Sequence, residues 1–208
     1  MADAAENTER GRGLGRALAW RHEGPGDGLP HWSLLDYAES PRTDDWTLRS
    51  ALVRLAQPEP VRVSATLELI RRCDAALKPY ATAISRHPVA CDRELTAAGL
   101  PRSPASPCLD ARATDLARLL RECPDVAASV TSGYAESNSL ADEELMALPL
   151  LVVALDLDLM ADALTAWSAE PRRTPPLSLV DDLGATAFHR LDRLEVPRQT
   201  GRPPTGSR

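Results

Sequence analysis

One segment of this chain, residues 145–164, is apolar on nearly every side and constrains the fold more than any other feature. Its apolar positions are too many for a single amphipathic stripe. Three carboxylates interrupt it: Asp156, Asp158 and Asp162. Because charges are costly inside a bilayer, a membrane span is excluded. We predict instead a long helix over residues 142–168 that neighbouring helices cover on nearly all sides.

The rest of the chain is rich in residues that favour helices. Ala and Leu are abundant, only 4% of the residues are aromatic, and runs of Val, Ile and Thr are scarce. With 208 residues and 43% hydrophobic content, the chain is long enough to bury a sizeable core. We therefore predict a mainly α fold, a helical bundle with disordered termini.

Charge and cysteine usage exclude several classes of function. A net charge of −6 and a pI of about 5.3 argue against general nucleic-acid binding and against binding to anionic membranes. The four cysteines form no Cys-x-x-Cys pair, and the scattered histidines complete no familiar zinc pattern. The N-terminus lacks the apolar stretch of a secretion signal, so we expect a cytoplasmic protein with free thiols.

Glycine and charge dominate both ends of the chain. Residues 1–30 contain six glycines among charged residues, a composition that buries too little apolar surface to become ordered. Residues 197–208 are similar in composition. We predict a flexible N-terminal arm over 1–30, a helical domain over 31–196 and a disordered tail over 197–208.

Apolar spacing with a 3.6-residue period predicts further helices within that domain. They cover residues 44–56, 61–77, 110–122, 124–134 and 178–194. Residues 88–107 carry four prolines, so we expect an irregular stretch with a short helix at 92–98. Pro149 lies inside the long helix and predicts a kink or a break near Ala147.

Residues 108–164 contain an ordered set of motifs. Leu-Asp-Ala-Arg-Ala-Thr-Asp-Leu-Ala-Arg-Leu-Leu is followed by Gly-Tyr and then by Glu-Glu-Leu-Met-Ala-Leu-Pro-Leu-Leu. This order resembles the late helices of the C-terminal lobe in aminoglycoside and choline phosphotransferases, which have a kinase-like fold. The resemblance implies that Asp115 makes structural hydrogen bonds near the catalytic loop. The alternative is an exposed acid in the first turn of an ordinary amphipathic helix.

The same family has a His-Gly-Asp or His-Arg-Asp catalytic loop, an asparagine five residues after the aspartate, and a further aspartate that binds magnesium. The best match here is residues 91–100, where Asp92 replaces the histidine, Glu94 the catalytic aspartate and Gly99 the asparagine. Glycine has no side chain with which to hold a metal. The resemblance thus implies Glu94 and Asp92 as catalytic candidates. Asp110 is the candidate metal ligand or, beside a helix start, an N-cap.

Other parts that phosphoryl transfer needs are missing from the sequence. The only lysine is Lys78, and residues 1–60 show no alternating strands of a nucleotide-binding lobe. We expect a degenerate phosphotransferase-like domain that acts as a binding or accessory protein, without a cofactor. Two alternatives remain open: an atypical small-molecule phosphotransferase that uses ATP and magnesium, and an unrelated helical interaction protein.

The apolar helix over 142–168 also predicts association. A shortened lobe has fewer elements with which to cover this helix than a complete one. We therefore expect the helices within residues 142–194 to form a homodimer interface or to bind a protein partner. Neither a membrane nor general nucleic acid is an expected partner.

Overall fold

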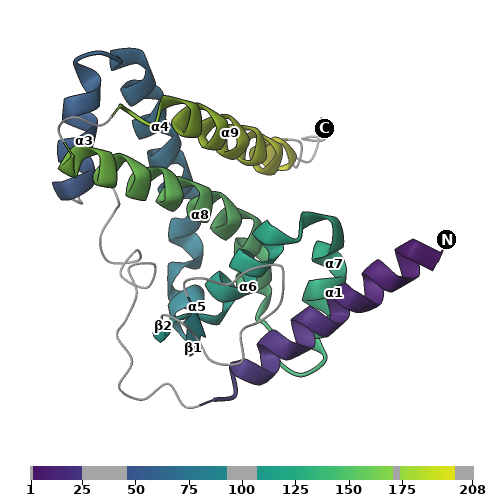
Figure 1. The fold of residues 1–208 in the computed structure, drawn as a ribbon. Coiled ribbons are helices and arrows are strands. Elements are labelled where there is room, and N and C mark those ends of the chain that lie inside the picture. The colour runs from purple at the N-terminus through teal and green to yellow at the C-terminus, as the bar shows by residue number, and fades with distance from the viewer. Residues whose placement is uncertain (1, 25–45, 93–106, 171–173, 200–208) are drawn as a thin grey trace, which may run out of the picture. The chain divides into compact units, whose positions relative to one another are not determined.

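A computed structural model describes residues 2–24, 46–92, 107–170 and 174–199, and the statements below concern these residues (Figure 1). Most of them are helical, which confirms the mainly α class. The chain divides into two compact units. Unit 1 comprises Met1–Arg42 and Asp74–Val152, and unit 2 comprises Thr43–Cys73 and Val153–Arg208.

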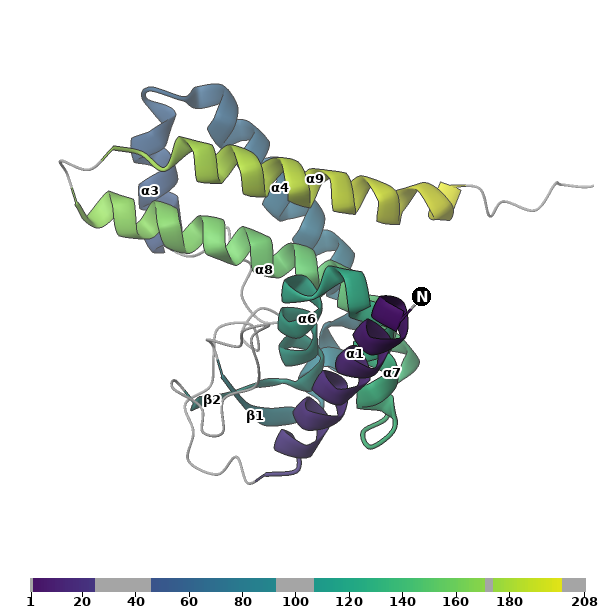
Figure 2. The ribbon, with the colours of Figure 1, turned by 45° about the vertical axis from the view of Figure 1, so that its right-hand side comes forward.

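Unit 1 combines helices with a small two-stranded sheet. Its elements are α1 (Ala2–Arg21), the end of α4 (Pro60–Leu77), η2 (Lys78–Tyr80), α5 (Ala81–Ser85), β1 (Pro88–Asp92), β2 (Pro107–Ala111), α6 (Arg112–Glu122), η3 (Pro124–Val126), α7 (Ala127–Ala135) and the start of α8 (Asp142–Ala169). Helices α1 and α7 lie side by side (Figure 2).

Over residues 2–21, helix α1 replaces the flexible N-terminal arm that was predicted for residues 1–30, and residues 25–30 lie outside the described part of the chain. One of the glycines that suggested disorder, Gly15, lets α1 approach α7 closely. A Cβ atom on Gly15 would lie 2.1 Å from the carbonyl oxygen of Val130, and one on Gly133 would lie 2.2 Å from that of Arg12. Small residues at such a crossing allow backbone to contact backbone. Leu18 on α1 is fully buried.

Strands β1 and β2 correct the prediction of an irregular stretch over residues 88–107 at its two ends, while residues 93–106 lie outside the described part of the chain. They pair in antiparallel register, with Pro88 opposite Ala111 and Asp92 opposite Pro107. Proline lacks a backbone N–H and is tolerated at the first position of a strand, where both Pro88 and Pro107 lie. The helix expected at 92–98 falls largely outside the described residues.

Unit 2 contains α3 (Trp46–Ala56), the start of α4, the rest of α8 and α9 (Leu177–Gln199). Arginine side chains join these helices. The Arg54 guanidinium lies 4.3 Å from the ring centroid of Trp167 and donates a 2.9 Å hydrogen bond to the Ser168 carbonyl near the end of α8. Arg62 binds both carboxylate oxygens of Asp181 on α9, at 2.7 and 2.9 Å. Such fork-to-fork pairs fix geometry as well as charge.

The long helix expected over residues 142–168 is confirmed as α8. It runs through Pro149 as one helix, so of the kink or break predicted near Ala147 the break does not occur. Asp156 is buried and pairs with Arg190 of α9 at 2.5 Å, which makes it part of a helix-pairing edge. Within the described residues, no helix combines the length and the apolar character that crossing a membrane would require.

Candidate functional site

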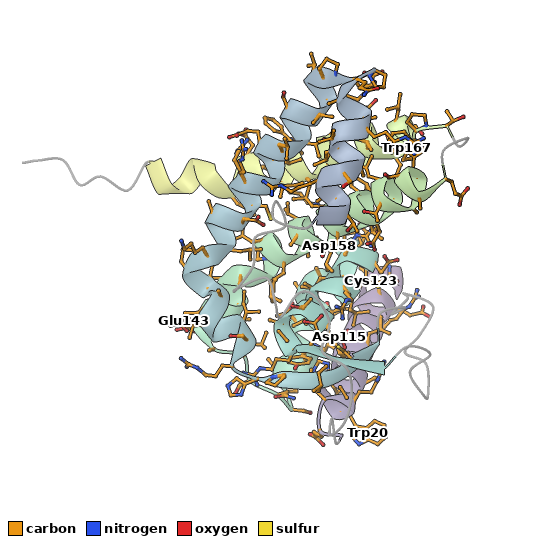
Figure 3. All side chains as sticks on the ribbon, turned by 90° about the vertical axis from the view of Figure 1, so that its left-hand side faces the viewer. Trp20, Asp115, Cys123, Glu143, Asp158 and Trp167 are labelled. Atoms are coloured by element: carbon orange, nitrogen blue, oxygen red, sulfur yellow. The ribbon has the colours of Figure 1, made fainter. Side chains whose placement is uncertain are left out.

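Five side chains in unit 1 form a connected set of hydrogen bonds that we name the buried polar cluster. Its members are His22, Asp110, Asp115, Arg118 and Tyr134. They come from four places in the chain: the residue after α1, strand β2, helix α6 and helix α7. All five residues are buried, and Figure 3 labels Asp115 on α6 among the side chains that surround it.

His22 joins two members of this cluster. Its Nε2 lies 3.0 Å from Oδ2 of Asp115, and its Nδ1 lies 2.7 Å from the Tyr134 hydroxyl. An ionised carboxylate only accepts hydrogen bonds, so Nε2 carries the hydrogen and donates it to Asp115. In the neutral imidazole Nδ1 then accepts from the Tyr134 hydroxyl. Burial raises the pKa of Tyr134, which keeps the phenol protonated and able to donate.

Arg118 holds the two carboxylates of the cluster. Its Nη1 donates to Asp115 at 3.0 Å and its Nη2 donates to Asp110. The second oxygen of Asp110 accepts the N–H of Ala111 at 2.7 Å. Burial raises the pKa of Asp110 to about 6, although Arg118 and the Ala111 N–H act in the opposite direction. For Arg118, burial alone disfavours the cation, yet the two carboxylates raise its pKa above the usual value.

A second ion pair joins the half-buried Arg112, at the start of α6, to the buried Glu144 near the start of α8. Arg112 donates to both carboxylate oxygens of Glu144, at 2.8 and 2.6 Å, and a third N–H contacts Asn138 at 3.3 Å. Glu144 also accepts the N–H of Ala141, which is half of a capping box at the helix start. Burial disfavours the Glu144 carboxylate, but the bonds from Arg112 and Ala141 outweigh it and lower its pKa.

Of the three residues predicted to act in catalysis or metal binding, two lie in the sheet and one lies outside the described residues. Asp92 ends strand β1, and Glu94 lies outside the described residues. Asp110 lies in β2 and bonds to Arg118. The alternative prediction of Asp110 as an N-cap is wrong, because Ala111 occupies that position of α6 and no side chain caps it. No group of three or more His, Cys, Asp or Glu within the described residues has the geometry of a metal site.

Asp115 is fully buried and bonded to two side chains, so the alternative of an exposed first-turn acid is wrong. Sequence reasoning missed three members of the cluster: His22, Arg118 and Tyr134. Arg118 follows Asp115 by three residues on one helix, a spacing that signals a pair. His22 gave no such signal, because its partner Asp115 lies 93 residues further along the chain.

The Tyr134 hydroxyl, the His22 imidazole and the Asp115 carboxylate are joined in that order by hydrogen bonds. Such an order of groups can pass a proton from one to the next. A group that does acid–base chemistry on a substrate must come within hydrogen-bonding distance of it. Here the side chains of His22 and Asp115 have no solvent-exposed surface. In this arrangement the cluster holds α1 and α7 to α6, and its hydrogen bonds stabilise the fold.

Comparison with models of protein families gave no match, and neither did comparison with curated proteins or with solved structures.

Proposed function

We propose that this chain is a helical binding or accessory protein that does not transfer phosphoryl groups. The observation that carries the proposal is the closed state of the buried polar cluster: His22, Asp115 and Arg118 are buried and bonded to cluster members. Hydrogen bonds to charged groups contribute about 1.5–3 kcal/mol each. A substrate could reach these side chains only if several of these hydrogen bonds were broken.

Exposed apolar side chains support the binding role. Trp20 on α1, which Figure 3 labels, is 74% exposed, and Met146 on α8 is 60% exposed, although both side chains are large and apolar. Tryptophan and methionine are enriched at protein interfaces, where their burial contributes much of the affinity. We propose that such side chains of the helices within residues 142–194 contact a second copy or a protein partner.

The resemblance of residues 108–164 to a phosphotransferase C-lobe supports a more specific form of the proposal. In this form, the domain derives from such an enzyme and has kept its late helices while the catalytic loop changed. Glu94 then occupies the position of the catalytic aspartate, and Gly99 that of the metal-binding asparagine. Binding without phosphoryl transfer follows from these replacements.

A thermal-shift measurement with ATP and magnesium tests the proposal. A ligand present at about one hundred times its dissociation constant stabilises the native state by about 2.7 kcal/mol. For a chain of this size that gain raises the melting temperature by several degrees. We expect no rise at millimolar ATP and magnesium, with magnesium chloride alone as the control.

A turnover assay gives the second part of the test. We expect no magnesium-dependent release of phosphate from ATP and no transfer to aminoglycoside, choline or sugar acceptors. Turnover that Glu94→Gln abolishes, and that Glu143→Gln leaves unchanged, would overturn the proposal in favour of an atypical phosphotransferase. Glu143 is an exposed acid on α8 and serves as the matched control.

A further inference from the structure

Few apolar side chains attach helix α1 to the rest of unit 1. The helix packs mainly along α7 (Figure 2), with a smaller contact to η3. Of its large apolar residues, Leu18 is fully buried, Leu14 is half-buried and Trp20 is 74% exposed. Helix α6, by contrast, is buried at every residue from 113 to 119. Because burial of apolar surface is the main force that holds a helix in place, α1 is held far less firmly than α6.

The glycines of α1 make its helical state depend on the contact with α7. Gly11, Gly13 and Gly15 lie in the middle of the helix. Glycine disfavours a helix more than any other residue except proline. A Cβ atom on Gly11 would lie 2.8 Å from the Cβ of Ser129, so Gly11, like Gly15, lies at the contact with α7. Since tertiary packing supplies most of the stability of such a helix, we expect this segment to unfold when it leaves α7.

His22 supplies the polar attachment of this segment. It follows the last residue of α1, and its ring bonds to Asp115 of α6 and to Tyr134 of α7. The other members of the buried polar cluster come from β2, α6 and α7. Release of α1 would therefore remove one member of the cluster. Arg118 would still donate to Oδ1 of Asp115, whereas Oδ2 of Asp115 and the Tyr134 hydroxyl would lose their bonds to His22.

We propose that α1 is a releasable cover of the buried polar cluster: it docks as a helix and leaves as an unfolded segment while the rest of unit 1 stays folded. Release carries His22 away and uncovers Asp115, Tyr134 and the face of α7 that carries Gly133. The freed carboxylate oxygen and hydroxyl then accept hydrogen bonds from N–H donors of a binding partner. This covered face is distinct from the exposed apolar side chains within residues 142–194 that the proposed association uses. Parts of a fold with few buried apolar contacts are the ones that open locally.

Hydrogen exchange of the full-length wild type tests the release. Mass spectrometry of peptic fragments compares the amides of residues 8–20 in α1 with those of residues 116–122 in α6, at urea concentrations below the unfolding transition. After correction for intrinsic rates, we expect the α1 amides to exchange at least about tenfold faster, because a local opening costs less free energy than global unfolding. Their rates should also depend less on urea, since a local opening exposes less surface. Equal rates with equal urea dependence in both helices would overturn the proposal.

A matched pair of variants tests the part that His22 plays. His22→Ala removes both hydrogen bonds to the cluster, whereas Trp20→Ala removes a larger side chain that is 74% exposed. We expect His22→Ala to raise the exchange rate of the α1 amides about tenfold or more, because docking then leaves buried polar groups without a partner. Trp20→Ala should change that rate by no more than about twofold. An unchanged rate in His22→Ala would overturn the role of His22, and the wild-type comparison decides the release itself even if this variant fails to fold.

Discussion

At the scale of single residues, Asp110 shows how burial and pairing oppose each other. Its carboxylate accepts hydrogen bonds from Arg118 and from the Ala111 N–H, which favour the ionised form. Its burial favours the neutral acid and has the larger effect, so its pKa in the folded protein is about 6 against an ordinary value of 3.8. The folded state therefore binds a proton at a pH where the unfolded chain has released it.

This difference predicts how stability depends on pH. Between pH 3.8 and pH 6 the folded protein holds more protons at Asp110 than the unfolded chain, so raising the pH lowers the free energy of unfolding. The stability contribution is present below the unfolded pKa and is lost as the pH rises through the folded one. It amounts to about 3 kcal/mol at most, since one pKa unit corresponds to about 1.4 kcal/mol.

Urea unfolding of the wild type and of Asp110→Asn, between pH 4 and pH 7.5, measures this effect. We expect the stability of the wild type relative to the variant to fall with rising pH and to level off above about pH 6.5. Because the pKa of Glu144 is lowered, this residue raises the free energy of unfolding as the pH rises. Both proteins contain Glu144, so its effect cancels when they are compared. A difference that stays constant or grows would mean that pairing with Arg118 keeps Asp110 ionised throughout.

At the scale of elements, the crossing of α1 and α7 offers a matched pair of substitutions. A Cβ atom on Gly15 would collide with backbone atoms of α7, whereas a Cβ on Gly13 of the same helix would meet no atom within 4 Å. Alanine favours a helix over glycine by about 1 kcal/mol. Both substitutions bring this local gain, but only Gly15→Ala also brings a backbone clash.

We expect Gly13→Ala to raise the free energy of unfolding by up to about 1 kcal/mol. Gly15→Ala should lower it by about 3 kcal/mol or more, because overpacking costs about 1–3 kcal/mol even where side chains can move. Urea unfolding measures both changes, and limited proteolysis reports whether α1 has detached from α7. If the two variants had equal stabilities, α1 would not pack on α7 in solution as described.

The sequence predicted those helices whose signal lies within one segment. The predictions over residues 61–77 and 142–168 agree with α4 and α8 within two residues at each end. Helix α1 was missed because glycine disfavours a helix locally, and only the presence of Gly133 on α7 explains its use. Strands β1 and β2 were missed for a similar reason, since each is short and is defined by its pairing with the other.

In the candidate site too, the sequence predicted only the residues whose signal lies within one segment. Asp110 was selected from the sequence, although for metal binding, and Asp115 was identified through the family resemblance as a hydrogen-bonding residue. Their partner Arg118 is close in sequence. The partners that close the cluster, His22 and Tyr134, lie in other segments and are brought together only by the crossing of α1 and α7. Local patterns carry no information on such a crossing.

At the scale of the whole molecule, arginine pairs with carboxylates in both units, and these pairs differ in burial. In unit 1, Arg112 and Arg118 bind carboxylates that are fully buried. In unit 2, Arg62 binds the exposed Asp181 of another helix, and salt weakens such a pair more than a buried one. Unit 2 also has a pair with a buried carboxylate, Arg190 with Asp156, so the pairs with buried carboxylates in both units should depend less on salt than the Arg62–Asp181 pair.

The exposed apolar side chains of α8 and α9 permit a test of association that leaves each helix folded. Met146 is 60% exposed in unit 1 and Phe188 is 52% exposed in unit 2. An aspartate at either position meets solvent in the monomer but would bury a charge in an interface. Leu155, by contrast, is buried, so an aspartate there would disrupt the fold itself.

We expect light scattering of the wild type at tens of micromolar to give twice the mass of one 22.5 kDa chain. Met146→Asp or Phe188→Asp should return the mass to that of one chain, and the variant that does so identifies the helix in the interface. Val61→Asp is the control, because Val61 is 81% exposed on α4, outside residues 142–194. A single-chain mass for the wild type would contradict the homodimer, and an unchanged dimer in both variants would place the interface elsewhere.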